Sequence, residues 1–318
     1  LLISVTFKMK QKVSKKILLV GLSSVFFMSC TSDEDPVNPV HPETATKVRM
    51  IVDDFFQSTA SALPTGESSI TEIEAYLFQN DTLKKCLGPL SSTGGDTYEL
   101  NIMNSDRGDI YFIANTEGHV DVSGLEEGTT LKSEFLKLAS KLNDDQTRLK
   151  GNHILTGSYQ RKKTGSAEVN LQRGVARLDL TVNVPQIKVK SISIDNVSNT
   201  GYVFKQSGVE TPSDVEKRTI RRDFSEPLTA SETGLFYLYE QNNAEMKLTM
   251  EIEADGKSNT LSAQLPESLS RNTIYTLTVN KTGTEDFEIT INVTTSVEDW
   301  TPGEDVTTTP DSIVSRTI

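Results

Sequence analysis

The chain has 318 residues, a hydrophobic content of 36% and a formal net charge of −12 at pH 7. This length suits two domains of ordinary size, each able to bury its own core. The acidic balance would repel a phosphate backbone and argues against nucleic-acid binding.

The first 29 residues have the pattern of a secretion signal. Five lysines within residues 8–16 precede an apolar run over residues 17–28, which is shorter than the about 20 residues that span a bilayer. Ser29 is the small residue before the cleavage point, and Cys30 follows it. Residues 27–30, Phe-Met-Ser-Cys, resemble a bacterial lipobox, in which the cysteine is acylated and becomes the mature N-terminus. We therefore expect cleavage between Ser29 and Cys30 and lipidation of Cys30. An ordinary secretion signal with an incidental cysteine is the alternative.

Residues 30–45 are expected to form an extended tether. They hold the acidic run Asp33-Glu34-Asp35 and three prolines, and acid and proline at this density do not pack a core. The acidic run also resembles the surface-export signal of Bacteroidota lipoproteins, which implies a surface-exposed protein of the cell outer membrane. A solvated linker held inside the periplasm is the alternative.

Met9 is the expected initiator. Cys86 is the other cysteine of the chain, and with Cys30 lipidated it is left without an internal disulfide partner.

Alternation of apolar and polar residues predicts half-buried β-strands along most of the remaining chain. The runs are residues 48–52, 73–77, 110–114, 176–184, 246–254, 275–279 and 287–293. Because one face of most runs is apolar and the other polar, we expect antiparallel sheets packed face to face. In the run of residues 176–184, the predicted core positions are Ala176, Leu178, Leu180 and Val182.

Residues 131–142 are the exception to this alternation. Leu131, Phe135, Leu138 and Leu142 recur at helical spacing, and a preceding threonine is a candidate N-cap. We predict one short amphipathic helix here, as part of the first domain.

Pro185 marks the predicted domain boundary, because proline lacks the amide N–H that a central strand needs. Beyond it, the alternation of residues 187–189 is out of phase with that of residues 192–194, which predicts a β-bulge. The predicted fold class is all-β, with two β-sandwich domains. The expected segments are residues 1–29 as signal peptide, 30–45 as tether, 46–185 as the first sandwich, and 186–318 as the second sandwich with its tail.

No arrangement of residues typical of an enzyme or a metal site stands out. His41, His119 and His153 have no second histidine or cysteine at ligand spacing, and we expect His119 and His153 in loops. Walker, nucleophile-elbow and dinucleotide motifs are missing from the sequence. We therefore expect neither catalysis nor a cofactor or metal.

Two further features each have two interpretations. Residues 107–109 spell Arg-Gly-Asp, which resembles an integrin-binding motif. The alternative is a turn before the strand at Ile110, with a positive φ at Gly108. Trp300, the only tryptophan, is expected to close the second core and not to stack on a sugar.

Four segments together resemble the fimbrillins, the FimA/Mfa family of type V pilus subunits of Bacteroidota. They are residues 173–177 with the pattern Arg-x-x-Ala-Arg, residues 234–240, residues 269–275 with the pattern Arg-Asn-x-x-Tyr, and residues 291–300. The resemblance implies two transthyretin-like Greek-key sandwiches and a structural, adhesive subunit of a cell-surface fimbria. Its partners would be other fimbrial subunits and the outer membrane, with a host or bacterial surface ligand unknown. A glycan-binding surface lipoprotein of a polysaccharide-uptake system is the alternative, which the 7% aromatic content disfavours.

The resemblance also implies assembly by donor-strand exchange, in which a protease removes the first strand and another subunit's tail fills the groove. The candidate first strand comprises Lys47, Val48, Arg49, Met50, Ile51 and Val52. The candidate donor tail contributes Val306, Ile313, Val314 and Ile318. Family stalk subunits are cut after an arginine in the loop that follows the first strand, but residues 57–69 contain neither arginine nor lysine. This departure predicts either an anchor or minor subunit that keeps its first strand, or cleavage by a protease of another specificity.

Overall fold

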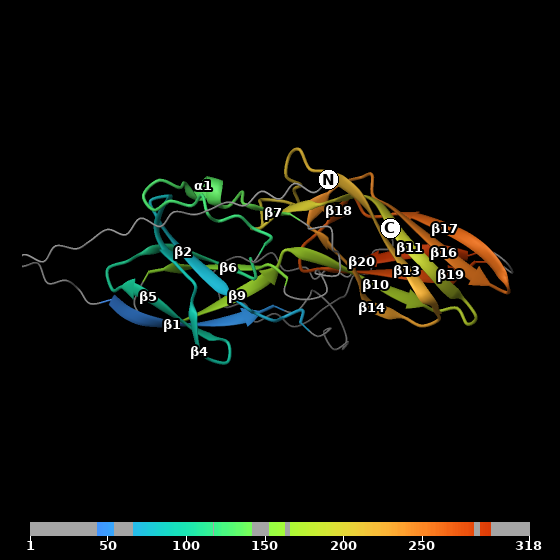
Figure 1. Ribbon diagram of the computed structural model, residues 1–318, viewed down its shortest axis with the longest axis horizontal. Coiled ribbons are helices and arrows are strands. Elements are labelled where there is room, and N and C mark those ends of the chain that lie inside the picture. Colours follow the sequence, from blue (N-terminus) through green and yellow to red (C-terminus); the bar gives the residue numbers. More distant parts are fainter. Residues whose placement is uncertain are drawn as a thin grey trace, which may run out of the picture. The chain divides into compact units, whose positions relative to one another are not determined.

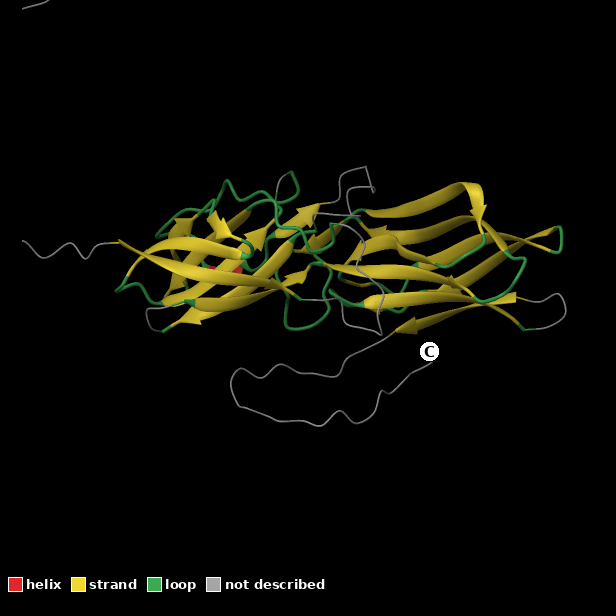
Figure 2. Cartoon of the chain, turned by 90° about the horizontal axis from the view of Figure 1, so that it is seen from below, coloured by secondary structure: helices red, strands yellow, loops and turns green. Residues whose placement is uncertain are grey.

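The computed structural model describes residues 43–53, 66–116, 118–141, 153–162, 166–282 and 287–293. The regular secondary structure of these residues is almost entirely β-strand (Figures 1 and 2), which confirms the all-β prediction. Among them, no helix is long and apolar enough to cross a membrane. The predicted signal peptide with Cys30, most of the tether, Trp300 and the candidate donor tail lie outside the described residues.

An eight-stranded sheet in the order β3-β2-β6-β8-β9-β1-β5-β4 builds the first sandwich. Its strands are β1 (Glu43–Val52), β2 (Ile73–Gln79), β3 (Thr82–Leu87), β4 (Ser91–Gly94), β5 (Thr97–Met103), β6 (Gly108–Ala114), β8 (Leu155–Arg161) and β9 (Ala167–Arg173). Only Leu155 and Thr156 of β8 pair with β9. Side chains from the strands on both sides of this short junction meet in one core, among them Leu77 and Phe112 from one side and Leu100 from the other. The sheet therefore closes on itself as a sandwich.

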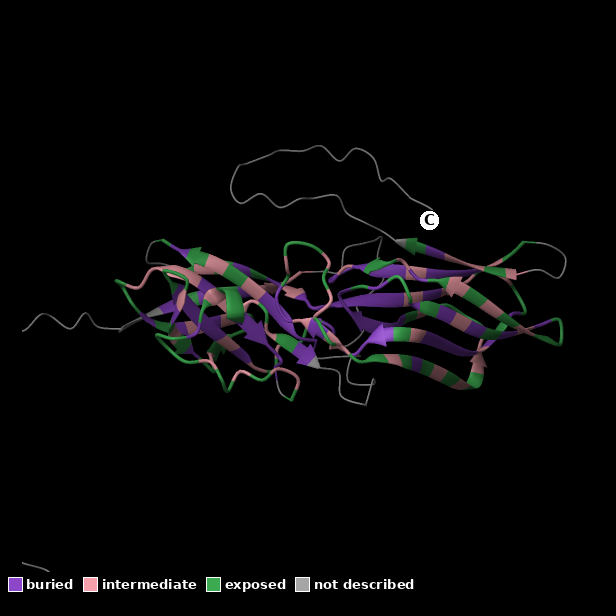
Figure 3. Ribbon diagram, turned by 90° about the horizontal axis from the view of Figure 1, so that it is seen from above, coloured by how far each residue is buried: buried purple, intermediate pink, exposed green. Residues whose placement is uncertain are grey.

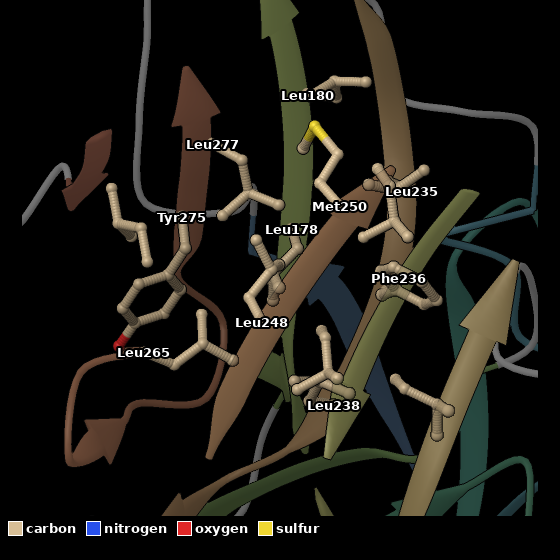
Figure 4. Packing of buried hydrophobic residues seen from close by; sticks show 14 of the residues in the cluster. Leu178, Leu180, Leu235, Phe236, Leu238, Leu248, Met250, Leu265, Tyr275 and Leu277 are labelled. Atoms are coloured by element: carbon tan, nitrogen blue, oxygen red, sulfur yellow. The ribbon is translucent and has the colours of Figure 1, made fainter. Parts of the chain in front are cut away.

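Two four-stranded sheets, β14-β10-β19-β20 and β13-β11-β16-β17, build the second sandwich. Their strands are β10 (Val175–Val182), β11 (Lys188–Ser198), β13 (Lys217–Leu228), β14 (Glu232–Tyr239), β16 (Lys247–Ala254), β17 (Lys257–Gln264), β19 (Ile274–Lys281) and β20 (Phe287–Val293). Leu178 and Leu277 from one sheet face Leu248 and Met250 from the other (Figure 4). Figure 3 shows buried residues alternating with more exposed ones along several strands, the pattern expected of strands with one buried face.

The strand β10 joins the second sandwich, although the sequence placed it before the boundary at Pro185. It pairs antiparallel with β14 and parallel with β19. Ala176, Leu178 and Leu180 are buried in the second core as predicted, and Val182 packs against that core half-buried. The chain therefore changes sheets at Gly174, between β9 and β10. The bounds of the two domains stay a prediction, and this pairing favours a boundary at Gly174.

Two local predictions have different outcomes. The bulge predicted after Pro185 is present in β11, where the register shifts between Val189 and Ser191 in both of its pairings. The helix predicted over residues 131–142 is wrong in extent, because α1 covers only Lys132–Phe135. Leu131 is 46% exposed and bridges to Thr82 as an extended residue. The strand β7 (Ala139–Lys141) follows shortly afterwards.

An aromatic cluster joins α1 to residues from the second half of the chain. Phe135 of α1 packs on Phe78 and on Phe204, with ring centroids 4.9 Å apart in both pairs. Nearby, β7 pairs with the short strand β12 (Thr200–Tyr202). Another short pair, β15 (Gln241–Asn242) with β18 (Ser268–Leu269), completes the described strands. The helical turn thus positions the Phe135 ring in the cluster, while Leu138 packs against it half-buried and Leu131 is exposed.

Candidate functional site

The candidate first strand, β1, is an interior strand of the first sandwich. Residues Glu43 to Arg49 pair antiparallel with β5, and Val48 to Val52 pair parallel with β9. The parallel pairing departs from the expected antiparallel sheet. Val48 and Met50 are buried at 0% and 1% exposure, whereas Lys47 and Arg49 point to solvent, and Ile51 and Val52 are half-buried. The strand therefore contributes apolar side chains to the core and backbone hydrogen bonds to two neighbours.

A buried arginine holds each end of β1. Near its start, Arg161, which is 2% exposed, donates from Nη1 to Thr46 Oγ1 at 3.1 Å. At its end, Arg173 donates from Nη1 to the carbonyl oxygen of Asp53, the residue directly after β1. The amide of Asp53 also donates to the carbonyl oxygen of Leu171 in β9 at 2.9 Å. Both ends of the strand are thus held by charged donors.

Arg173 also contacts the segment that leads to β2. Its Nε donates to the carbonyl oxygen of Glu67 at 2.9 Å, and its Nη1 donates to Asn272 Oδ1 at 3.0 Å. The side chain is fully buried. Because Asn272 follows Arg271 in the Arg-Asn-x-x-Tyr segment, the two arginine motifs of the sequence meet at this point.

The carboxylate of Glu67 is the acidic centre of the site. Arg177 Nη1 lies 3.0 Å from Glu67 Oε2, and these two side chains are 3% and 0% exposed. Tyr237 donates its hydroxyl to Glu67 Oε1, and Arg177 Nη2 binds Asp179 Oδ2 at 2.9 Å. Burial raises the pKa of Glu67, and the Tyr237 hydrogen bond and the Arg177 charge oppose this rise. The arrangement has the features of a structural ion-pair network, because each buried charge has a partner of opposite charge.

His153 packs against this network. Its ring centroid lies 4.6 Å from that of Tyr237, and it is 2% exposed. Within the described part of the chain, neither of its ring nitrogens has a hydrogen-bond partner. Burial lowers the pKa of His153 to about 3, helped by the nearby charges of Arg173 and Arg177. The sequence interpretation of an ordinary loop residue is incomplete, because His153 lies outside the strands yet belongs to the interior.

The Arg-Gly-Asp tripeptide forms a turn that leads into a strand, which was the alternative to an integrin-binding motif. Gly108 has φ of 133° and begins β6. A Cβ atom here would lie 2.0 Å from the carbonyl oxygen of Phe78, so glycine is required. The carboxylate of Asp109 binds Lys132 Nζ at 3.1 Å. The Asp109 side chain is 31% exposed and already paired with a lysine of α1, which disfavours the adhesive interpretation.

Metal and sugar sites find no support in the described part of the chain. It contains no group of three or more His, Cys, Asp or Glu residues that could hold a metal ion. Its exposed large apolar side chains are Met103 and Leu131, and neither is aromatic. A stacking platform for sugars would need exposed aromatic rings.

Solved structures with a similar fold include fimbrial proteins. The tip fimbrial protein Mfa3 from Porphyromonas gingivalis, with C-terminal truncation, is 16% identical with a TM-score of 0.53, over 79% of this chain and 99% of that chain. A fimbrial assembly protein from Parabacteroides distasonis is 14% identical with a TM-score of 0.52, over 79% and 95%. The fimbrilin FimA from Porphyromonas gingivalis is 12% identical with a TM-score of 0.51, over 79% and 97%. At these identities the likeness shows the fold, which is that of fimbrial β-sandwich proteins.

The family is shown by the sequence itself. Residues 62–305, more than half of the chain, match the family described as "Fimbrillin-A associated anchor proteins Mfa1 and Mfa2". The chain belongs to this family and is a structural subunit of a cell-surface fimbria, as the resemblance implied. No curated protein matches it.

Sequence reasoning recognised only part of this site. The sequence identifies Arg173 and Arg177 as part of a family motif, but it predicts neither their partners nor their role. Glu67 was not singled out, because it lies in a loop far along the chain from Arg177. One signal could have pointed to the pair: an arginine that alternates with apolar residues in a core strand needs a buried acid.

Proposed function

We propose that this protein is a lipid-anchored, membrane-proximal subunit of a fimbria that keeps its first strand. The single observation that carries the proposal is the position of β1 inside the sheet, between β5 and β9. A strand in this position fills the groove that another subunit's tail would otherwise occupy. The segment after it returns to the interior at Glu67, which is fully buried.

The distribution of basic residues supports retention of the strand. After Arg49 the next arginine or lysine is Lys84, which lies within β3. Arg49 itself is inside β1, where its Nη1 lies 3.1 Å from Glu168 Oε1. Proteases cut exposed, flexible backbone more readily than a paired strand. A protease specific for basic residues therefore lacks a suitable site between β1 and β2.

Retention of β1 sets the role in assembly. With its own groove filled, the subunit can begin a fibre at the membrane but cannot be inserted in the middle of a stalk. Its proposed donor tail is residues 306–318, with Val306, Ile313, Val314 and Ile318 as the groove-filling side chains. Its proposed partners are other fimbrial subunits and the outer membrane, reached through the acyl chains of Cys30, and it needs no catalytic activity.

Mass spectrometry of the protein in purified fimbriae tests the proposal. We expect the mature chain to begin at an acylated Cys30 and to include β1. An N-terminus between Phe55 and Ile70 would show that the strand is removed and would return the chain to the stalk or tip.

The anchor is tested separately by Cys30→Ala. We expect this variant to be released from the membrane or left with its signal peptide uncleaved, because several acyl chains are needed for stable anchoring. Membrane fractions probed with antibody give the readout, and Ser32→Ala is the matched control. Equal membrane retention of both variants would contradict lipidation at Cys30.

A further inference from the structure

Arg173 contacts the backbone on both sides of the connection between β1 and β2. Its Nη1 donates to the carbonyl oxygen of Asp53, where β1 has just ended, and its Nε donates to the carbonyl oxygen of Glu67 at 2.9 Å. We propose that Arg173 is a positioning residue that keeps β1 in the sheet even when the connection is cut. This inference rests on the proposed function, in which β1 is retained.

The surroundings of Arg173 explain why it can hold the strand. Its guanidinium is fully buried and is oriented from the second half of the chain by Asn272 Oδ1 at 3.0 Å. Asn272 is fixed in turn, because its backbone N–H donates to the carbonyl oxygen of Val175 at 2.8 Å. The planar fork of arginine is then pre-organised to donate to two carbonyl groups at once. Hydrogen bonds from a charged donor are stronger than those between neutral groups.

The two arginines of the motif differ in the groups that they bind. Arg173 reaches the end of β1 itself, and Gln172 next to it adds a bond from Nε2 to Asp53 Oδ2 at 3.3 Å. Arg177 binds the carboxylate of Glu67, which belongs to the segment leading to β2. Loss of the Glu67 charge should therefore weaken the junction without releasing β1, whereas loss of the Arg173 guanidinium should release it.

The test separates β1 from the rest of the chain by a cut of known position. A recognition sequence for a site-specific protease is inserted between Ala60 and Ser61 of the full mature chain, purified in detergent. The insertion is made in the parent and in the variants Arg173→Met and Glu67→Gln. After cleavage, release of the N-terminal fragment is followed by size-exclusion chromatography with an excess of a synthetic peptide of residues 43–53.

We expect the parent to keep the fragment and Arg173→Met to release it at least about tenfold faster, the effect of losing one or more hydrogen bonds to a charged donor. Glu67→Gln should release it at the parent's rate, although its uncut form melts at a lower temperature. Equal release rates for the parent and Arg173→Met would overturn the proposal. Equal release from Arg173→Met and Glu67→Gln would also overturn it, because the effect would then be general destabilisation.

A second variant covers the case in which Arg173→Met does not fold. Arg173→Lys keeps the charge but cannot reach both carbonyl groups with a fixed fork, so we expect release faster than from the parent. Release at the parent's rate would contradict the role of the guanidinium. The N-terminus of the fimbrial protein remains the separate test of the proposed function: a missing β1 in fimbriae refutes that function, and a fragment lost from the cut parent refutes this inference.

Discussion

Arg271 and Glu240 form a buried ion pair in the second half of the chain. Arg271 Nε lies 3.0 Å from Glu240 Oε1, and the two side chains are 3% and 4% exposed. The same guanidinium donates to the carbonyl oxygens of Val203 and Tyr202 at 2.9 and 2.8 Å. The pair thereby fixes the chain next to β12, which pairs with β7.

Arg271→Met should lower the free energy of unfolding by about 3–5 kcal/mol, because the carboxylate of Glu240 would remain buried without its partner. Unfolding in guanidinium chloride measures the loss. Arg49→Met is the matched control, since its ion pair with Glu168 is 60% and 63% exposed and such pairs contribute at most about 1 kcal/mol. Similar losses in the two variants would contradict the importance of burial.

Leu178→Asp should leave the protein unfolded. Leu178 is fully buried in β10 between Phe236 and Tyr275 on the neighbouring strands (Figure 4). A buried, unpaired carboxylate costs several kcal/mol, and a whole domain has a stability of only about 5–15 kcal/mol. Circular dichroism and thermal melting provide the measurement. Asn183→Asp, at an exposed position just after the same strand, should melt like the parent.

The stability of the protein should fall in acid because of His153. Its pKa is lowered to about 3 in the folded state, whereas an unfolded histidine titrates near about 6.5. Protons therefore bind the unfolded chain first as the pH falls below that value, and the stability is lost progressively down to about pH 3, by at most about 1.4 kcal/mol per pH unit. His153→Phe should show a shallower loss between pH 6.5 and 4 in denaturant titrations. The same slope in variant and parent would exclude His153 as the cause.

Gly157→Ala should destabilise the first sandwich. A Cβ atom on Gly157 in β8 would lie 2.4 Å from the carbonyl oxygen of Asn170 and 2.9 Å from Val169 Cγ1. Relief of this overlap requires movement of the β9 backbone, at a cost of about 1–3 kcal/mol. Thermal melting gives the comparison with Gly124→Ala, where a Cβ atom would meet nothing within 4 Å. A variant at Gly157 as stable as the one at Gly124 would show that β9 can shift freely.

The alternation of side chains predicted seven of the described strands, because a strand with one buried face has apolar residues at every second position. They are β1, β2, β6, β10, β16, β19 and β20. The bulge in β11 could be predicted for the same reason: a change of phase is a local signal. Which sheet a strand joins depends on residues far along the chain and cannot be predicted from the sequence of the strand itself. The partner of β10 along its parallel edge is β19, which lies far along the chain, so Pro185 marked the end of a strand but not the change of sheet.

The extent of the helix and the buried network could not be predicted from the sequence for a related reason. The spacing of Leu131, Phe135 and Leu138 fits a helix, but Phe135 is fully buried in the aromatic cluster, Leu138 packs against it half-buried, and Leu131 is exposed. One helical turn is enough to place that ring, and the chain then forms the strand β7, which pairs with β12. Glu67 and Arg177 become partners only through the folded sheet, and neither local sequence contains the other's position.

The position of β1 between two ladders has a mechanical consequence. A strand at the edge of a sheet can be peeled away one hydrogen bond after another. A pull along β1 instead loads its antiparallel ladder with β5 and its parallel ladder with β9 at the same time, in shear. Forced separation is governed by the height of the unfolding barrier rather than by equilibrium stability. A fibre that begins at this subunit would therefore transmit tension into the part of the molecule where many weak bonds must break together.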